Sequence, residues 1–232
     1  MEFYHVLNRG VDKRKIFLEE RDYVRFVHDL FEFNDTAPAE STCRRFNVSF
    51  RTNSIARREV GGTGCRDKKE VRDFVVHIHQ FCLMPNHYHL LLSPVKKGTI
   101  PLFMKKLNMG YSRYFNEKYK RRGTLFQGRY KSVHVANEAH FTHLPYYIHC
   151  NPLDLSMPEW RERKINVRDA EKFLRSYRWS SHLDYLGIHN FPSVTQREFL
   201  LEYFQGSDGY KESMRSWFQS FEPPNNPAIL LE

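Results

Sequence analysis

Two histidines separated by a single residue, His87 and His89, lie in the segment MPNHYHLLL. The segment reads as a strand, and in a strand residues i and i+2 point to the same face of the sheet. The two imidazoles can therefore share one cation. Tyr88 faces the opposite side, and the LLL run that follows is typical of a strand with both faces buried. We interpret His87 and His89 as candidate metal ligands at the border of a core.

A second pair with the same spacing, His77 and His79, lies in VVHIHQF on the preceding predicted strand. No turn adjoins this pair, and its mid-strand pattern is typical of residues that pack or line a polar face. It stays open as a second source of ligands.

A tyrosine and an asparagine in PYYIHCNP are the right types to complete such a site. Tyr147 and Asn151 are four residues apart in a predicted helix, so they share one helical face. A metal would polarise a phosphate ester, the Asn151 amide would complete the metal shell, and the Tyr147 phenolate would attack phosphorus. Tyr146 would point about 100° away. Because the chain has 13 tyrosines, a core aromatic is the alternative reading of Tyr147.

A basic stretch with interleaved tyrosines follows the histidine pair in the sequence. Between residues 105 and 131 it carries Lys105, Lys106, Arg113, Lys118, Lys120, Arg121, Arg122, Arg129 and Lys131, with tyrosines at 111, 114, 119 and 130. Glu117 is the stretch's one acidic residue. Cations for phosphates and rings for unstacked bases suit a single-stranded nucleic acid, whereas a solvated helix face is the alternative. We assign to a DNA-binding surface Lys105, Arg113, Arg121, Arg122, Arg129, Tyr130 and Lys131, and also Asn8 and Arg9 at the end of the first predicted strand.

The elements that must position these residues follow the order β-α-β-β-α-β-α. Periodicity and turn residues predict strands over 3–10, 74–84, 87–95 and 124–136, and helices over 19–35, 100–122 and 137–152. For the helix over 100–122 we expect one face to carry Leu102, Met109, Tyr114 and Phe115. The order predicts an α+β fold, a small antiparallel sheet with helices on one face.

The chain divides into a predicted catalytic domain over 1–152 and a helical extension over 153–232. An arginine-rich insertion over 36–70 interrupts the first domain, and the last residues, EPPNNPAILLE, read as unstructured. The formal charge of the 232 residues is +9, which favours a polyanionic partner. We see neither a transmembrane run nor a signal peptide, and expect a protein of the bacterial cytoplasm with no membrane partner. The four cysteines form no CxxC pair, so free thiols are expected, although Cys43 and Cys65 could be joined.

Five stretches in order resemble the REP-associated tyrosine transposases, a branch of the single-tyrosine transposases with a histidine–hydrophobe–histidine (HUH) motif. They are YHVLNRG, FCLMPNHYHLLL, GTLFQGRYKS, YYIHCNP and YRWSS, and together they span roughly residues 3–181. The insertion over 36–70 is longer than the link expected there, and is either a DNA-binding arm or a loop.

This resemblance implies a ferredoxin- or RRM-like sheet with the histidine pair on a central strand. It implies cleavage and rejoining of single-stranded DNA near hairpins through a covalent 5′-phosphotyrosine. His87 and His89 match the metal-binding histidines, Asn151 the third ligand and Tyr147 the nucleophile. The metal would be Mg²⁺ or Mn²⁺, and the protein would act as a monomer or as a homodimer.

Two other functions compete with the transposase. A hairpin-binding module of the same fold would bind DNA or RNA without a metal and without Tyr147. A metallo-phosphohydrolase would use water as nucleophile and release free products, and His77 and His79 could then supply ligands.

Overall fold

The protein folds around one four-stranded antiparallel sheet. The computed structural model describes residues 1–36, 72–162 and 164–220, so the predicted insertion, apart from its first residue, and the last twelve residues lie outside the described part. The strands are β1 (Tyr4–Arg9), β2 (Val76–Met84), β3 (His87–Pro94) and β4 (Lys131–His134), and their order in the sheet is β2-β3-β1-β4. All pairs are antiparallel. β3 is therefore an inner strand, as the resemblance implies.

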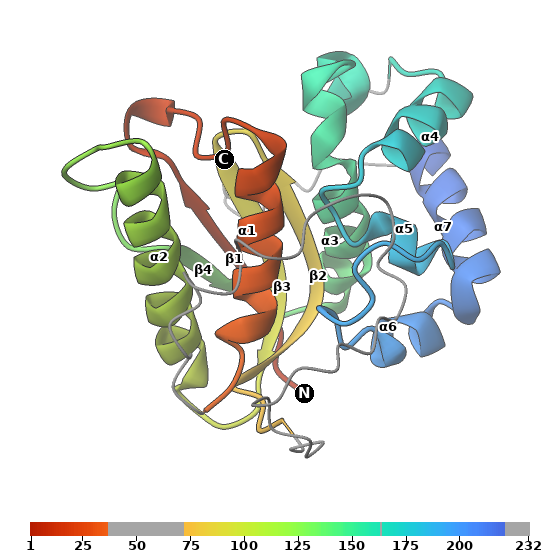
Figure 1. Ribbon diagram of the computed structural model, residues 1–232. Helices are drawn as coiled ribbons and strands as arrows, with labels where there is room; N and C mark the ends of the chain where they lie inside the picture. Colours follow the sequence, from red (N-terminus) through yellow and green to blue (C-terminus); the bar gives the residue numbers. More distant parts are fainter. Residues whose placement is uncertain (37–71, 163, 221–232) are drawn as a thin grey trace, which may run out of the picture.

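Two helices cover one face of this sheet (Figure 1). They are α1 (Glu20–Glu32) and α2 (Thr99–Lys118), and a short 3₁₀ turn, η1 (Val11–Lys13), precedes them. With α3 (Glu138–Cys150) the order is β-α-β-β-α-β-α, which confirms the predicted α+β fold and its ferredoxin-like strand order. Asn137 caps α3, because its side chain accepts a hydrogen bond from the His140 backbone N–H.

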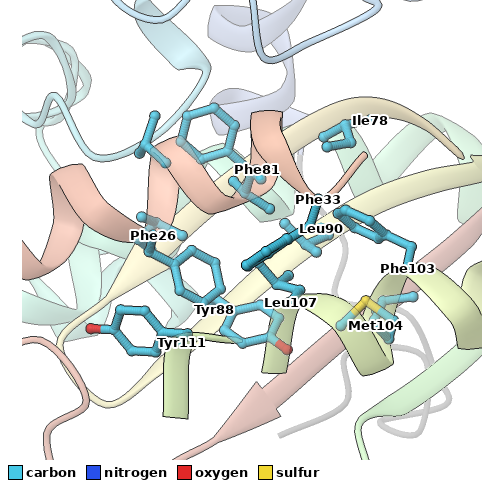
Figure 2. Close-up of a cluster of buried hydrophobic side chains, with 14 of the residues drawn as sticks. Phe26, Phe33, Ile78, Phe81, Tyr88, Leu90, Phe103, Met104, Leu107 and Tyr111 are labelled. Atoms are coloured by element: carbon cyan, nitrogen blue, oxygen red, sulfur yellow. The ribbon is translucent and has the colours of Figure 1, made fainter. Parts of the chain in front are cut away.

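The core between the sheet and α1 and α2 is rich in aromatic rings (Figure 2). It holds Phe26, Phe81, Tyr88, Leu90, Phe103, Leu107 and Tyr111, all fully buried. The buried side of α2 thus follows residues 103, 107, 111 and 115, a spacing of four. The predicted apolar face was wrong at Leu102 and Met109, which are exposed. Leu102 lies one position and Met109 two positions from the nearest residues of the buried ridge, and an apolar side chain alone does not fix the helix phase.

β4 is shorter than the predicted strand over 124–136. Residues 124–130 instead form a loop that bonds to the end of β1, where the Gln127 N–H donates to the Arg9 carbonyl at 2.8 Å and the Val11 N–H to the Leu125 carbonyl at 2.9 Å. Leu125 and Phe126 are buried. Side-chain burial in this loop produces the apolar pattern that sequence alone reads as a strand.

α3 covers the opposite face of the sheet, and the C-terminal elements lie on the same side of the molecule, with α4 and α7 beyond α3 (Figure 1). These elements are η3 (Asn151–Leu155), η4 (Pro158–Glu162), α4 (Val167–Ser176), α5 (His182–Tyr185), α6 (Glu198–Tyr203) and α7 (Gly206–Ser220). One buried cluster joins Leu91 of the sheet and Tyr147 of α3 to Leu183, Tyr210 and Trp217. The extension therefore packs against the helix that carries the candidate nucleophile. None of the helices in the described residues is long and apolar enough to cross a bilayer.

Candidate metal and nucleophile site

The two histidines of the HUH motif lie on β3, on the face that α3 covers. His87 pairs with Arg9 of β1, and His89 pairs with Leu7. Their ring centroids are 4.9 Å apart with the planes at 80°. Tyr88 lies on the other face, in the core with α1 and α2. The strand period of two thus places both imidazoles on one face, as expected from their spacing.

Each histidine has one ring nitrogen in a hydrogen bond and one without a partner. The His87 Nδ1–H donates to the Asn86 Oδ1 at 2.6 Å, and His89 Nδ1 lies 2.9 Å from His5 Nε2. The Nε2 atoms of His87 and His89 are buried and have no hydrogen-bond partner among the described residues. A buried polar atom without a partner is costly, and a hydrogen bond at Nδ1 that leaves Nε2 open is the arrangement of metal-bound histidines.

Burial keeps both histidines neutral. Burial first and the Arg9 guanidinium second lower the pKa of His87 to about 4. For His89, burial is again the main cause and the neighbouring His87 is the next, and together they hold its pKa well below the usual value. A neutral imidazole can bind a cation without first losing a proton.

The candidate nucleophile faces this pair from α3. The Tyr147 ring lies 5.9 Å from the His89 ring and 6.1 Å from the His5 ring, nearly perpendicular to both. Tyr146 points away and packs on Phe204 and Trp217, each at 5.6 Å. The structure thus places Tyr147, and not Tyr146, on the side of the helix that faces the histidines, as the helical spacing from Asn151 predicts.

Asn151 is tied to Tyr147 at the end of the same helix. Its Nδ2 donates to the Tyr147 backbone carbonyl at 2.8 Å. Its Oδ1 is buried and has no hydrogen-bond partner within the described part of the chain. The amide is thus held by its nitrogen and leaves its oxygen available.

The open atoms fit a divalent metal of the Mn²⁺ type. Two neutral imidazole nitrogens and one amide oxygen are available at His87, His89 and Asn151. Among the described residues no group of three or more His, Cys, Asp or Glu side chains could hold a metal. Asn151 would supply a third protein ligand beside the two histidines. Imidazole suits Mn²⁺ better than Mg²⁺, which prefers oxygen ligands.

In the other histidine pair, His77 Nδ1 is buried without a hydrogen-bond partner among the described residues, whereas His79 is structural. His79 Nδ1 lies 3.1 Å from the Gln196 carbonyl, and its Nε2 lies 2.8 Å from the Ser93 Oγ. Both ring nitrogens are thus engaged, and His79 has no open position for a metal. The sequence alone left this alternative open because Gln196 is 117 residues distant.

The residues assigned to a DNA-binding surface are dispersed. Arg9 lies beside His87, whereas Asn8 is buried on the other face and donates to the Gly128 carbonyl. Lys105 and Arg113 are exposed on α2, the helix on the face opposite the histidine pair, and Arg113 pairs with Glu117. Also exposed are Arg122, Arg129 and Lys131, while Arg121 and Tyr130 are half-buried.

Sequence reasoning missed three residues around the site, His5, Asp154 and Arg161. His5 contacts His89 from β1, and Arg161 lies over the Tyr147 ring, with its Cζ 5.4 Å from the ring centroid. Asp154 binds Arg161. His5 lies in YHVLNRG two residues before Leu7, on the same face of the predicted strand, so alternation could have indicated it. No spacing rule relates Arg161 to Tyr147, which lies 14 positions earlier in the sequence.

Buried histidines also connect α3 to the C-terminal extension. His149 Nδ1 lies 2.6 Å from the Tyr210 hydroxyl, and His149 Nε2 lies 2.7 Å from the Ser181 Oγ. His182 Nδ1 lies 3.0 Å from the same Tyr210 hydroxyl. This network holds the helix of Tyr147 between the YRWSS segment and α7.

Two buried histidines, His79 and His182, should make the free energy of unfolding sensitive to acid. Burial lowers the pKa of His79 to about 4 and that of His182 to about 3. An unfolded histidine titrates near 6.5, so below that pH the unfolded state binds more protons and the free energy of unfolding decreases. At pH 5 each histidine costs about 2 kcal/mol relative to pH 7.5. Urea unfolding at several pH values measures this, and His182→Asn should reduce the slope. An unfolding free energy that is constant from pH 7.5 to 5 would contradict it.

Comparisons with known proteins agree with the motifs. A family model described as "Transposase IS200 like" matches residues 67–151, which contain the histidine pair, Tyr147 and Asn151. This confirms the resemblance to these transposases over the matched residues. No curated protein matches the sequence. A solved structure of a REP-associated tyrosine transposase bound to a REP hairpin is similar at 11% identity, with a TM-score of 0.40, and covers 67% of this chain and 68% of that chain.

Proposed function

We propose, from the match of residues 67–151 to the IS200-like transposases, that the protein is a metal-dependent transposase that cleaves and rejoins single-stranded DNA. One observation carries the proposal. Three buried side-chain atoms that can bind a metal have no hydrogen-bond partner in the described residues: Nε2 of His87, Nε2 of His89 and Oδ1 of Asn151. The Tyr147 ring packs against the His89 imidazole. A hairpin-binding module has no need of such open ligands.

His87, His89 and Asn151 would hold the metal, which we propose to be Mn²⁺ or Mg²⁺. A cation there would act as a Lewis acid on the scissile phosphate. His5 and Asn86 orient the two imidazoles through their Nδ1 atoms, so the ligands are preorganised before DNA binds.

Tyr147 would be the nucleophile. Its Oη forms a bond to the 5′-phosphate while the P–O3′ bond breaks, so the protein is joined to the 5′ end and a 3′-hydroxyl is released. Attack by that or another 3′-hydroxyl reverses the step and rejoins DNA. Because Tyr147 is only 1% exposed, side chains that cover the phenol have to move when the strand binds.

The partner would be single-stranded DNA beside a hairpin. The proposal of a hairpin rests on the resemblance of the five motifs, and the cations support a phosphate backbone as ligand. Arg9 is beside the metal position, and Arg122, Arg129 and Lys131 are exposed in and beside the loop that bonds to the end of β1. The cations of this loop would bind the phosphates of a DNA strand that reaches the side of the sheet formed by β1 and β4.

The test is a denaturing gel of the full-length protein with end-labelled single-stranded hairpin oligonucleotides, in Mn²⁺ or in EDTA. We expect a labelled band of protein size that survives denaturation and requires Mn²⁺. Cleaved DNA without this band would indicate water as the nucleophile and a phosphohydrolase. Native binding with neither product, over a pool of randomised stems and flanks, would indicate a hairpin-binding module.

A further inference from the structure

An arginine of the C-terminal extension reaches the candidate site. Arg161 lies on η4, and its guanidinium is 5.4 Å from the Tyr147 ring centroid and 4.8 Å from the Trp160 ring centroid. About a quarter of its side chain is exposed. It is thus the charged group that lies over the candidate nucleophile and still contacts solvent.

Arg161 is held in place by a bidentate ion pair. Its Nε and Nη2 donate to the two carboxylate oxygens of Asp154 at 3.0 Å and 2.7 Å. Trp160 Nε1 donates to the same carboxylate at 2.6 Å. A phosphodiester offers a guanidinium the same two-oxygen geometry as a carboxylate. Asp154 therefore occupies, at rest, the position that a DNA phosphate could take on Arg161.

A second arginine approaches the same histidines from β1. Arg9 pairs with His87 across β1 and β3, and its Nε is buried with no hydrogen-bond partner among the described residues. Arg161 lies over the Tyr147 ring, which in turn packs against His89. Two guanidinium groups thus flank the place where metal and phosphate would meet, and the unpaired Nε–H of Arg9 indicates an absent acceptor.

We propose that Arg161 is a catalytic residue of the strand-cleavage reaction, which exchanges the Asp154 carboxylate for the scissile phosphodiester when DNA binds. This rests on the proposed function. A guanidinium held beside Tyr147 stabilises the phenolate and the charge that accumulates on the phosphate in the transition state.

The exchange has a defined place in the reaction. The Tyr147 hydroxyl loses its proton to solvent, and its oxygen electron pair forms the Oη–P bond. The P–O3′ bond breaks with its electron pair on O3′, which takes a proton from water. Arg161 keeps all of its protons and forms hydrogen bonds to the non-bridging oxygens, while Asp154 is released to solvent.

The test uses full-length Arg161→Gln, Arg161→Lys and Asp154→Asn, with Arg168→Gln on the exposed side of α4 as the matched control. Single-turnover formation of the covalent adduct in Mn²⁺ is measured from pH 6 to 10. Arg161→Gln should be about 100-fold slower than the wild type at pH 7, because the scissile phosphate has lost its guanidinium partner. Arg161→Lys keeps the charge but not the two-oxygen contact, so it should recover only part of the rate. Asp154→Asn should be faster than the wild type, because the carboxylate no longer competes with the phosphodiester for Arg161, and Arg168→Gln should equal the wild type.

A binding measurement tests the phosphate contact separately. With Tyr147→Phe as the background to prevent cleavage, the slope of log K against log salt for the oligonucleotide should decrease by about one on Arg161→Gln, and should not decrease on Asp154→Asn. An unchanged slope on Arg161→Gln would overturn the exchange.

Other outcomes overturn the proposal without overturning the transposase. If Asp154→Asn is as slow as Arg161→Gln and both unfold at lower temperature, the ion pair is structural. If Asp154→Asn loses Mn²⁺ affinity, Asp154 is a metal ligand. If Arg161→Gln forms adduct at the wild-type rate and pH, Arg161 has no part in the chemistry. Absence of adduct in the wild type would overturn the proposed function and this inference with it.

Discussion

Tyr147→Phe should abolish the covalent protein–DNA adduct and slow strand cleavage at least about 10⁴-fold. The change removes one oxygen, and with it the atom that would bond to phosphorus. Phenylalanine keeps the ring that packs on His5 and His89, so folding and DNA binding should be preserved. The denaturing gel in Mn²⁺ measures the adduct, and a filter-binding or fluorescence titration measures DNA affinity.

Tyr146→Phe is the matched control, because it removes the same atom from the adjacent residue. Tyr146 packs on Phe204 and Trp217, away from the histidines, so its adduct yield should equal that of the wild type. The assignment of Tyr147 would be wrong if the two substitutions had the opposite effects. Unaltered cleavage in Tyr147→Phe, with free 5′-phosphates as product, would show that water is the nucleophile.

Replacement of His89 or His87 by alanine should weaken Mn²⁺ binding by about 100-fold or more and reduce adduct formation to a similar or greater degree. Each replacement removes one of the open Nε2 atoms. Calorimetric titration with Mn²⁺ measures the affinity without any DNA. His89→Ala also leaves a cavity beside His5. His89→Asn serves as a second variant, because asparagine is polar and fills more of this space than alanine does.

His77→Ala is the control for this pair, because it disrupts the other His-x-His sequence. His77 is half-buried on β2, and its neighbour His79 is engaged at both ring nitrogens. Mn²⁺ affinity and adduct yield should be unaffected. Loss of Mn²⁺ binding in His77→Ala, with normal binding in His87→Ala, would move the metal site to β2.

The fold class and the order of its elements were accessible from the sequence because they depend on local periodicity. Alternation in FYHVLNRG and HYHLLLSPV predicts β1 and β3, and the helical spacing of apolar residues predicts α1. Periodicity does not decide whether an apolar residue is buried or exposed, or whether a buried one lies in a strand or in a loop. Leu102 and Met109 are exposed on α2, and Leu125 is buried in a loop rather than in a strand, because burial in each case depends on what packs opposite.

What the sequence by itself determined about the site is which residues share a face. The strand period of two places His87 with His89, and the helical period of 3.6 places Tyr147 with Asn151 and directs Tyr146 elsewhere. These relations need no distant contact, so they hold once the strand and the helix form.

The tertiary structure alone decided which histidines have both ring nitrogens engaged and which charges surround the candidate site. His79 is satisfied by Ser93 and by a carbonyl 117 residues distant, whereas Nε2 of His89 has no hydrogen-bond partner among the described residues. Arg161 of η4 lies over the Tyr147 ring of α3, although the two residues are far apart in the sequence. Hydrogen-bond partners and electrostatic fields act through space, and the separation of residues along the chain does not encode them.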